Sequence, residues 1–155
     1  MIVGCANVPR MDEGDAPRRL RALPSWLLAR AALLGARTVT AHLEEAGMRR
    51  AHYALLVALR EDGPASQAAL GRRLAADRSD MHRTVGDLES RGLIAREPDP
   101  EDRRRNVVTL TGAGVAALAE ADALVDAAQS ELLAPLSADE REELVRLLSS
   151  ALERA

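Results

Sequence analysis

Three consecutive arginines, Arg103 to Arg105, end a charged stretch of the sequence, PDPEDRRR. A guanidinium group binds a phosphate through paired hydrogen bonds and is attracted by the strongly negative potential of a narrow minor groove. A carboxylate one or two residues away can hold an arginine side chain in one rotamer. We expect Asp102 to hold Arg104 in this way; the alternative is an ordinary solvated loop.

A second group of polar side chains is expected on one face of a helix from about Asp77 to Arg91. Met81, Val85 and Leu88 recur at helical spacing and predict a narrow apolar face that must be buried. The opposite face carries small polar groups around one long cation: Ser79, Arg83, Gly86 and Ser90, with His82 and Asp87 on its flanks. Such a face can lie against a groove of double-stranded DNA.

The element that precedes this helix is expected to be a shorter helix, Ser66 to Ala76, which buries leucines and is capped by the Ser66 hydroxyl. Asp77 follows as the cap of the second helix. Asp80 stands three residues later, so we expect it to complete a capping-box-like arrangement rather than to contact a base. The two helices are therefore joined by a tight turn.

The element that follows is expected to be a β-hairpin. Gly92 is a typical residue for the end of the second helix. The segments Leu93 to Glu97 and Asn106 to Thr111 are short and rich in Ile, Val, Leu and Thr, and they predict two paired strands. Helix, turn, helix and hairpin in this order are the arrangement of a winged helix-turn-helix.

The segment from about Arg49 to Thr111 resembles the DNA-binding lobe of the multiple antibiotic resistance regulator (MarR) family of bacterial transcription factors. The family's wing pattern matches Asp102, Arg104, Val108, Leu110 and Thr111, after Asp99-Pro100, and its upstream pattern matches Leu88, Glu89, Gly92 and Leu93. Asp80 departs from the pattern, which has a hydroxyl residue there, and the chain contains no lysine.

The resemblance implies a mainly α fold with a small β-hairpin wing, in which a winged helix-turn-helix DNA-binding lobe is joined to a helical dimerisation lobe. Arg78, Ser79, His82 and Arg83 would face the major groove, and Arg104 would enter the adjacent minor groove. The complete set of expected DNA-binding residues is Ser66, Gln67, Arg78, Ser79, His82, Arg83, Arg103, Arg104 and Arg105, with Asp102 supporting the wing.

The rest of the chain is expected to organise the assembly. Residues 1–23 are expected to be a flexible N-terminal segment, and residues 24–155 a single MarR-like domain, with the DNA-binding lobe at about 49–111 and dimerisation helices at about 24–46 and 112–153. Long helices are predicted from Pro24 to about Glu45 and from Thr111 to Pro135, and the last helix begins with a capping box, Ser137 to Glu140.

The terminal helices carry more apolar surface than a lobe of this size can cover, so we assign them to a subunit interface. Packing within one chain is the alternative on the sequence alone, and the resemblance, which implies terminal helices that dimerise, favours a homodimer. A two-fold dimer implies a pseudo-palindromic operator in double-stranded DNA, with half-site centres about 10 base pairs apart. The formal net charge of the chain is −3, but residues 66–105 carry +1 and residues 111–155 carry −6. The cations are therefore nearer the expected DNA face, and DNA binding should weaken with salt.

An effector is suggested by the resemblance alone, because members of the family commonly bind small phenolic or aromatic acids and then release DNA. The candidate ligand-binding residues are Trp26, Arg30, Arg37, His42, His52 and Tyr53. For most of these, packing in the core or solvation is the simpler interpretation. Cys5, the single cysteine, offers an alternative redox switch, although it stands among acidic residues that do not lower a thiol pKa.

Other classes of function find less support. The histidines lack metal-ligand spacing, Cys5 has no placed base and no Gly-rich phosphate loop occurs, so we expect no enzyme, no metal and no cofactor. Apolar runs are too short to cross a bilayer, which predicts a cytoplasmic protein without a membrane partner. A winged-helix module that binds only protein remains the alternative to a DNA-binding repressor.

Overall fold

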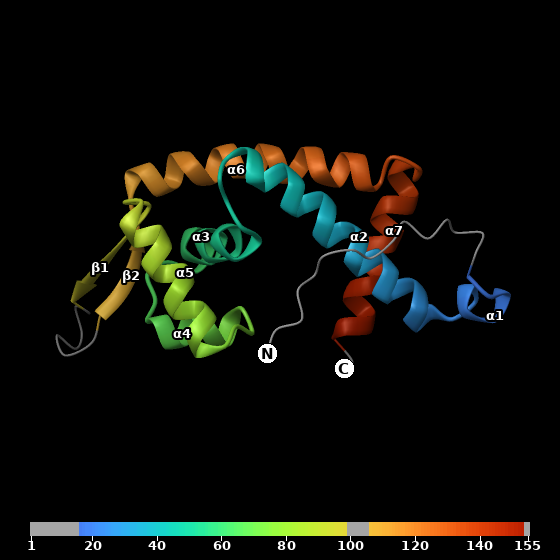
Figure 1. Ribbon diagram of the computed structural model, residues 1–155, viewed down its shortest axis with the longest axis horizontal. Helices are drawn as coiled ribbons and strands as arrows, with labels where there is room; N and C mark the ends of the chain where they lie inside the picture. The colour runs from blue at the N-terminus through green and yellow to red at the C-terminus, as the bar shows by residue number, and fades with distance from the viewer. Residues whose placement is uncertain (1–15, 99–105, 154–155) are drawn as a thin grey trace. The chain divides into compact units, whose positions relative to one another are not determined.

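The computed structural model describes residues 16–98 and 106–153. The described elements are mainly helical, with one small antiparallel hairpin, as predicted (Figure 1). The chain divides into two compact units, residues 1–36 and 37–155. In chain order the elements are α1 Arg18–Arg21, α2 Pro24–Glu45, α3 Arg50–Asp62, α4 Gln67–Arg73, α5 Arg78–Ser90, β1 Ile94–Pro98, β2 Asn106–Leu110, α6 Gly112–Leu132 and α7 Ala138–Leu152.

The described part of the first unit consists of α1 and the first part of α2. The predicted start of α2 at Pro24 is confirmed. The single turn α1 lies within the segment 1–23, for which no element was predicted. Three of its four residues are arginines, so it lacks the apolar periodicity from which helices are predicted. The large apolar side chains that remain exposed in the described part of this unit are Leu23, Leu27, Leu28, Leu33 and Leu34.

The core of the second unit surrounds the apolar face of α5. Met81, Val85 and Leu88 are at most 3% exposed, which confirms the predicted buried face. In Figure 1, α3, α4 and α5 lie close together with the hairpin beside α5. Removal of these side chains from water fixes α5 with its polar face outward. The partners in the cluster include Leu55, Leu56, Leu70, Ile94, Val108 and Leu118.

The hairpin is bonded to the helical part of the lobe as well as to itself. Its strands pair in an antiparallel register that places Ile94 opposite Leu110 and Pro98 opposite Asn106. The N–H of Val108 donates to the carbonyl of Ala65 at 2.8 Å, and the N–H of Ala65 donates back at 3.2 Å. The hairpin is thus fastened to the segment that leads into α4.

Side-chain caps define where the helices begin. Ser66 accepts a hydrogen bond from the N–H of Ala69, and Ser137 forms the predicted capping box with Glu140. Asp77 caps α5 by accepting from the N–H of Asp80 at 2.8 Å. The expectation that the Asp80 carboxylate completes this cap is wrong. Aspartate is one methylene shorter than the glutamate typical of that position, and here its carboxylate turns to an arginine.

The start of α6 lies close to the backbone of Leu93, the residue before β1. Gly92 ends the preceding segment with φ +68°, as expected of a residue that follows a helix. The Thr111 hydroxyl donates to the Gly92 carbonyl at 2.7 Å and also caps α6 through the N–H of Gly114. Gly114 is buried, and a Cβ at this position would overlap the carbonyl oxygen of Leu93.

The apolar positions of α6 and α7 differ in exposure. On α6, Leu118, Ala121 and Ala128 are fully buried. On α7 no residue is buried, and several large apolar side chains are exposed: Val145, Leu147, Leu148 and Leu152. Within residues 16–98 and 106–153, no helix has the length and apolar character needed to cross a membrane.

Candidate nucleic-acid interface

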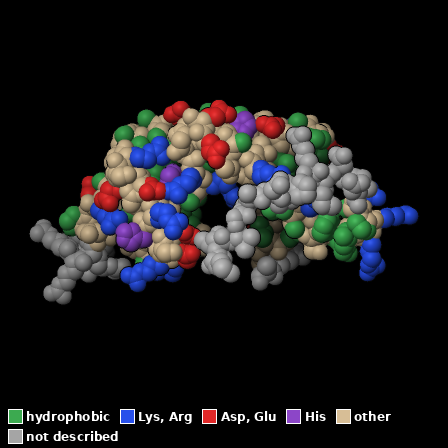
Figure 2. Space-filling view, viewed as in Figure 1, with side chains coloured by type: hydrophobic (Ala, Val, Ile, Leu, Met, Phe, Trp, Pro, Cys, Tyr) green, Lys and Arg blue, Asp and Glu red, His purple; other side chains and the backbone are tan. Residues whose placement is uncertain are grey.

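The outward face of α5 brings together four of the predicted DNA-binding side chains. Arg78, Ser79, His82 and Arg83 are all exposed. They point outward because Met81, Val85 and Leu88 hold the other face of the helix in the core. Figure 2 shows arginine, histidine and acidic side chains interspersed over the region of α4 and α5. This face therefore offers donors and cations, although it is not uniformly basic.

A groove lies between α4 and α5, on the same side of the lobe. Its volume is about 630 Å³. Gln67, at the first position of α4, lines it together with Arg78 and His82 of α5. Ser66 is half-buried immediately before α4, where its hydroxyl is engaged as the cap. The groove is completed by Ala68, Gly71, Arg72, Ala75, Ala76 and Met81.

The first turns of α5 hold their polar side chains through short-range contacts. An Arg83 guanidinium nitrogen lies 3.2 Å from a carboxylate oxygen of Asp80. The Ser79 hydroxyl donates to Asp77 at 2.8 Å. The N–H of Asp80, followed by the Ser79 hydroxyl, lowers the pKa of Asp77, so this cap stays charged at neutral pH. Arg83 is thus oriented by Asp80, although an exposed pair of this kind contributes little to stability.

The predicted wing tip lies outside the described residues. Arg103, Arg104, Arg105 and the supporting Asp102 belong to the segment 99–105. The described base of the hairpin is connected to α5 by an ion pair in which Arg96 of β1 lies 3.2 Å from Glu89. The strands that lead to the wing tip are therefore attached to the helix that carries Arg83.

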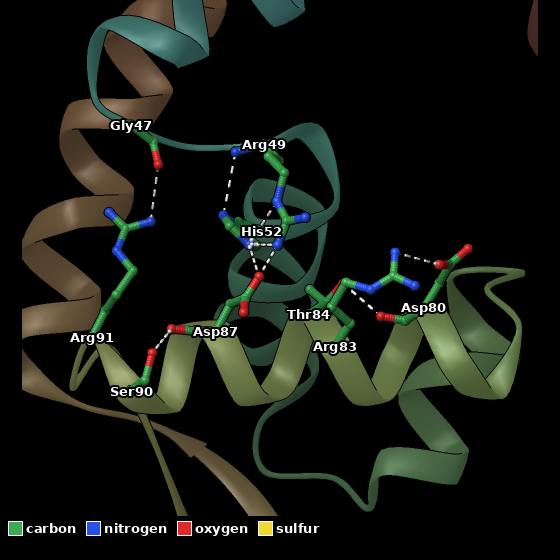
Figure 3. A network of polar contacts seen from close by, with 9 residues as sticks. All are labelled: Gly47, Arg49, His52, Asp80, Arg83, Thr84, Asp87, Ser90 and Arg91. Carbon is green, nitrogen blue, oxygen red and sulfur yellow. Dashed lines mark hydrogen bonds and ion pairs between the residues drawn. The ribbon is translucent and has the colours of Figure 1, made fainter. Parts of the chain in front are cut away.

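A polar network ties the other end of α5 to the start of α3 (Figure 3). Asp87 pairs with Arg49, and its carboxylate also lies 3.7 Å from Nε2 of His52. The Arg49 guanidinium lies 2.8 Å from the same ring nitrogen, and the Arg49 backbone N–H faces Nδ1 at 3.3 Å. A second link joins Arg91 to the carbonyl of Gly47 at 3.1 Å.

His52 is uncharged in this network. Its side chain is buried, and burial, together with the positive charges of Arg49 and Arg91, lowers its pKa from 6.5 to about 4. Both ring nitrogens face N–H groups of Arg49; a neutral imidazole can accept a hydrogen bond at one of its nitrogens, whereas a doubly protonated ring could accept at neither. The network therefore requires a neutral imidazole.

Comparisons with known proteins identify the family. A profile of the MarR family matches residues 46–105. The chain is 33% identical to the transcriptional regulator HosA of Escherichia coli O111:H- over 67% of this chain and 79% of HosA. The chain belongs to the MarR family. It is also 38% identical to the HTH-type transcriptional repressor NicR of Pseudomonas putida, over 65% of this chain and 64% of NicR, less than two thirds of that relative's length.

Solved structures of MarR-family and related regulators resemble the fold. A probable transcriptional regulator from Pseudomonas aeruginosa is 37% identical, with a TM-score of 0.76 over 86% of this chain and 99% of that one. A MarR variant from Escherichia coli, solved in complex with operator DNA, is 26% identical, with a TM-score of 0.75 over 88% and 99%.

A third structure concerns an effector. It is that of BpsR from Bordetella bronchiseptica, whose DNA binding is regulated by 6-hydroxynicotinic acid; BpsR is 26% identical, with a TM-score of 0.76 over 88% and 97%. The relatives are named as regulators rather than enzymes, as predicted from the sequence. In the described parts of this MarR-family chain, no group of three or more His, Cys, Asp or Glu side chains could hold a metal.

The candidate ligand-binding residues have different surroundings. His42 lies 2.9 Å from Glu131 of α6, and the Tyr53 hydroxyl donates to Asp122 of α6 at 3.0 Å. Burial and the bond to Asp122 raise the pKa of Tyr53. His52 is enclosed in the network with Arg49. Trp26 and Arg30 are half-buried on the first part of α2, and Arg37 is exposed.

The arginines and acids that hold these side chains could not be predicted from the sequence. Arg49 and Asp87 are separated by 38 positions, and Tyr53 and Asp122 by 69, so no local pattern connects them. One signal was present: Arg49 precedes the first turn of α3, and His52 stands three residues later, at the spacing of a helix cap. Arg49 cannot accept a hydrogen bond, so only the histidine half of such a cap can form.

Proposed function

We propose that this MarR-family protein is a sequence-specific double-stranded DNA-binding transcriptional regulator that acts as a homodimeric repressor. The observation that carries the proposal is α5, whose apolar face is buried while Arg78, Ser79, His82 and Arg83 face outward. A helix so presented can enter the major groove, and an arginine there can bind guanine through two hydrogen bonds.

The surrounding residues would set the register of α5 on the duplex. We assign Ser66 and Gln67 to the sugar-phosphate backbone beside the groove between α4 and α5. The wing arginines Arg103, Arg104 and Arg105 would bind phosphates and the minor groove, with Asp102 holding Arg104. In this assignment, the lobe at about 49–111 contacts DNA.

The dimer would be formed by the helices at about 24–46 and 112–153. Its support is the large apolar side chains that α7 leaves exposed, among them Val145, Leu147 and Leu152. Side chains of this kind gain by burial against a second copy. Two-fold symmetry then places one α5 in each half of a pseudo-palindromic operator.

Selection of bound sequences from random duplex DNA tests this function. We expect the full chain to recover an inverted repeat with half-site centres about 10 base pairs apart, because two copies of α5 would occupy successive major grooves on one side of the duplex. Affinity for the recovered operator should fall steeply with salt, with each neutralised phosphate contributing about −0.9 to the logarithmic slope. Failure to enrich any duplex at low salt would contradict DNA binding.

A matched pair of variants controls for folding and charge in that experiment. Arg83→Ala should weaken operator binding by about 1–3 kcal/mol and relax the preference at one base position. Arg146 of α7 also pairs with an acid three residues earlier and is similarly exposed, 64% against 61% for Arg83. Arg146→Ala should therefore bind the operator like the unsubstituted protein. A protein-binding module would show no difference between the two variants.

We further propose that a small aromatic acid releases the operator. The regulation of BpsR by 6-hydroxynicotinic acid supports this class of effector. Of the candidate residues, Arg37 is exposed and can pair with a carboxylate, whereas His42, His52 and Tyr53 are already engaged with protein partners. The carboxylate is therefore expected to be the essential group of the effector.

Titration of 6-hydroxynicotinic acid and hydroxylated benzoic acids into the operator complex tests the effector. At least one acid should release the DNA, and its uncharged amide should not, because an amide cannot form the ion pair. Release should be weaker in Arg37→Gln. If none of the acids releases the operator, or if the amides act equally well, the carboxylate-sensing proposal is wrong.

A further inference from the structure

Asp87 is an acidic residue on α5, a helix whose affinity for DNA an acidic side chain would not increase. Asp87 would be repelled by phosphates, yet its side chain is turned toward the start of α3, where it pairs with Arg49 (Figure 3). Two charged side chains from different elements are thus joined across the lobe. The pairing gives Asp87 a role that does not require contact with DNA.

The pair is built on a buried side chain. His52 is 4% exposed, and its Nε2 lies 2.8 Å from Arg49 and 3.7 Å from the Asp87 carboxylate. The ring therefore forms a fixed wall beside the Arg49 guanidinium, which limits the positions that the guanidinium can take. Ordering a long arginine side chain costs conformational entropy, and contacts of this kind offset that cost.

A second contact attaches α5 to the segment that precedes α3. Arg91 stands four residues after Asp87, on the same side of the helix, and donates to the carbonyl of Gly47. Gly47 has φ +61° and lies in the turn that connects α2 to α3. Two contacts one helical turn apart fix the rotation of α5 about its own axis as well as its position.

The clamp is next to the DNA-facing side chains. Arg49 and Arg83 line the same shallow groove, of about 300 Å³, together with Asp80. Asp80, the one acid among the lining residues of this groove, is the acid that orients Arg83. The clamp and the DNA-facing Arg83 therefore border the same groove of the lobe.

We propose that Arg49, His52 and Asp87 form a clamp that positions the recognition helix α5 for operator binding without touching DNA. Asp87 is a positioning residue: its carboxylate pairs with Arg49 and lies beside the ring of His52. The proposal rests on the proposed function, since it concerns the affinity of the same helix for DNA. Binding sites tolerate only small errors in orientation, so a loosened helix should lose affinity for the operator while the lobe stays folded.

A double-mutant cycle separates this clamp from simple electrostatics. Electrostatics alone predicts that Asp87→Asn binds the operator more tightly, that Arg49→Gln binds more weakly, and that the double variant, with both charges removed, binds like the unsubstituted protein. The clamp predicts that all three lose affinity to a similar extent, about 10-fold, because breaking either partner breaks the same link. The slope of affinity with salt should stay unchanged in Asp87→Asn, since no phosphate contact is lost.

Asp62→Asn is the matched control. It makes the same substitution in the same lobe, and Asp62 is similarly exposed, 52% against 46% for Asp87, but it pairs with Arg73 of α4 rather than with Arg49. We expect no loss of operator affinity in this variant. Hydrogen exchange of the α5 amides, measured without DNA, should be faster in Asp87→Asn than in Asp62→Asn.

Each outcome has a separate meaning. If the unsubstituted protein binds no duplex, the proposed function fails, and the clamp fails as a device for DNA binding. If it binds and Asp87→Asn binds equally well or better, or if the double variant recovers full affinity, the clamp alone is wrong. Thermal unfolding of every variant shows whether a lost affinity reflects an unfolded lobe; a loss in Asp87→Asn that follows only the unfolded fraction would also overturn the clamp.

Discussion

Gly114→Ala is expected to unfold the unit formed by residues 37–155 or to lower its free energy of unfolding by about 3 kcal/mol or more. A Cβ at Gly114 would overlap the carbonyl oxygen of Leu93 and would stand 2.9 Å from Cδ1 of Leu110. The Leu93 carbonyl belongs to the backbone, so it cannot rotate away as a side chain could. It also accepts a hydrogen bond from the N–H of Thr111 at 3.1 Å, and this bond would be lost if the Leu93 backbone moved aside. Urea unfolding followed by circular dichroism measures the effect.

Gly112→Ala is the control for the intrinsic effect of alanine in this helix. Gly112 lies two residues earlier at the start of α6, and a Cβ there meets no atom within 4 Å. Alanine is the better helix former, so this variant should be unchanged or slightly more stable, by less than about 1 kcal/mol. Equal stability of Gly114→Ala and Gly112→Ala would show that the close approach of α6 to Leu93 is not required.

Acidification is expected to destabilise the protein through His52. Above pH 6.5 the ring is neutral in both the folded and the unfolded chain and has no effect. Between pH 6.5 and about 4 the unfolded chain takes up a proton that the folded chain excludes, so the free energy of unfolding falls as the pH falls. The loss attributable to this ring should approach about 3 kcal/mol below the folded-state pKa.

The difference between the unsubstituted protein and His52→Gln isolates this contribution, because carboxylates titrate in both. Urea unfolding at intervals from pH 7 to pH 4 should show a steeper decline for the unsubstituted protein. His82→Gln, which changes an exposed histidine of α5, should retain the steep decline. Parallel curves for the unsubstituted protein and His52→Gln would mean that the ring accepts its proton in the folded state as easily as in the unfolded chain.

Local patterns in the sequence predict most of the fold. The spacing of Met81, Val85 and Leu88 identifies the buried face of α5 because helical periodicity depends only on neighbouring turns. The caps at Ser66 and Ser137 follow from the hydrogen-bonding capacity of their hydroxyls within one turn, and both are confirmed. The same local information places Arg78, His82 and Arg83 on the outer face.

Long-range pairing explains what the sequence does not predict. The sequence predicts only that Asp87 flanks the polar face of its helix. Its partner Arg49 is 38 positions away and comes next to it only in the folded chain. Tyr53 and His42 are candidates for ligand binding because of their chemistry, whereas the structure gives them acids of α6 as partners. Asp80 differs for a local reason, since either a cap or a nearby arginine can satisfy its carboxylate and sequence spacing allows both.

The two hydrogen bonds between Ala65 and Val108 restrict the movements by which the protein could release an operator. They fasten the hairpin to the chain just ahead of α4, and the pair between Arg96 and Glu89 fastens it again to α5. Retraction of the hairpin alone would break both attachments. In the proposed homodimer, release of the operator is therefore expected to move the hairpin and the helices together, which would change the distance between the two copies of α5.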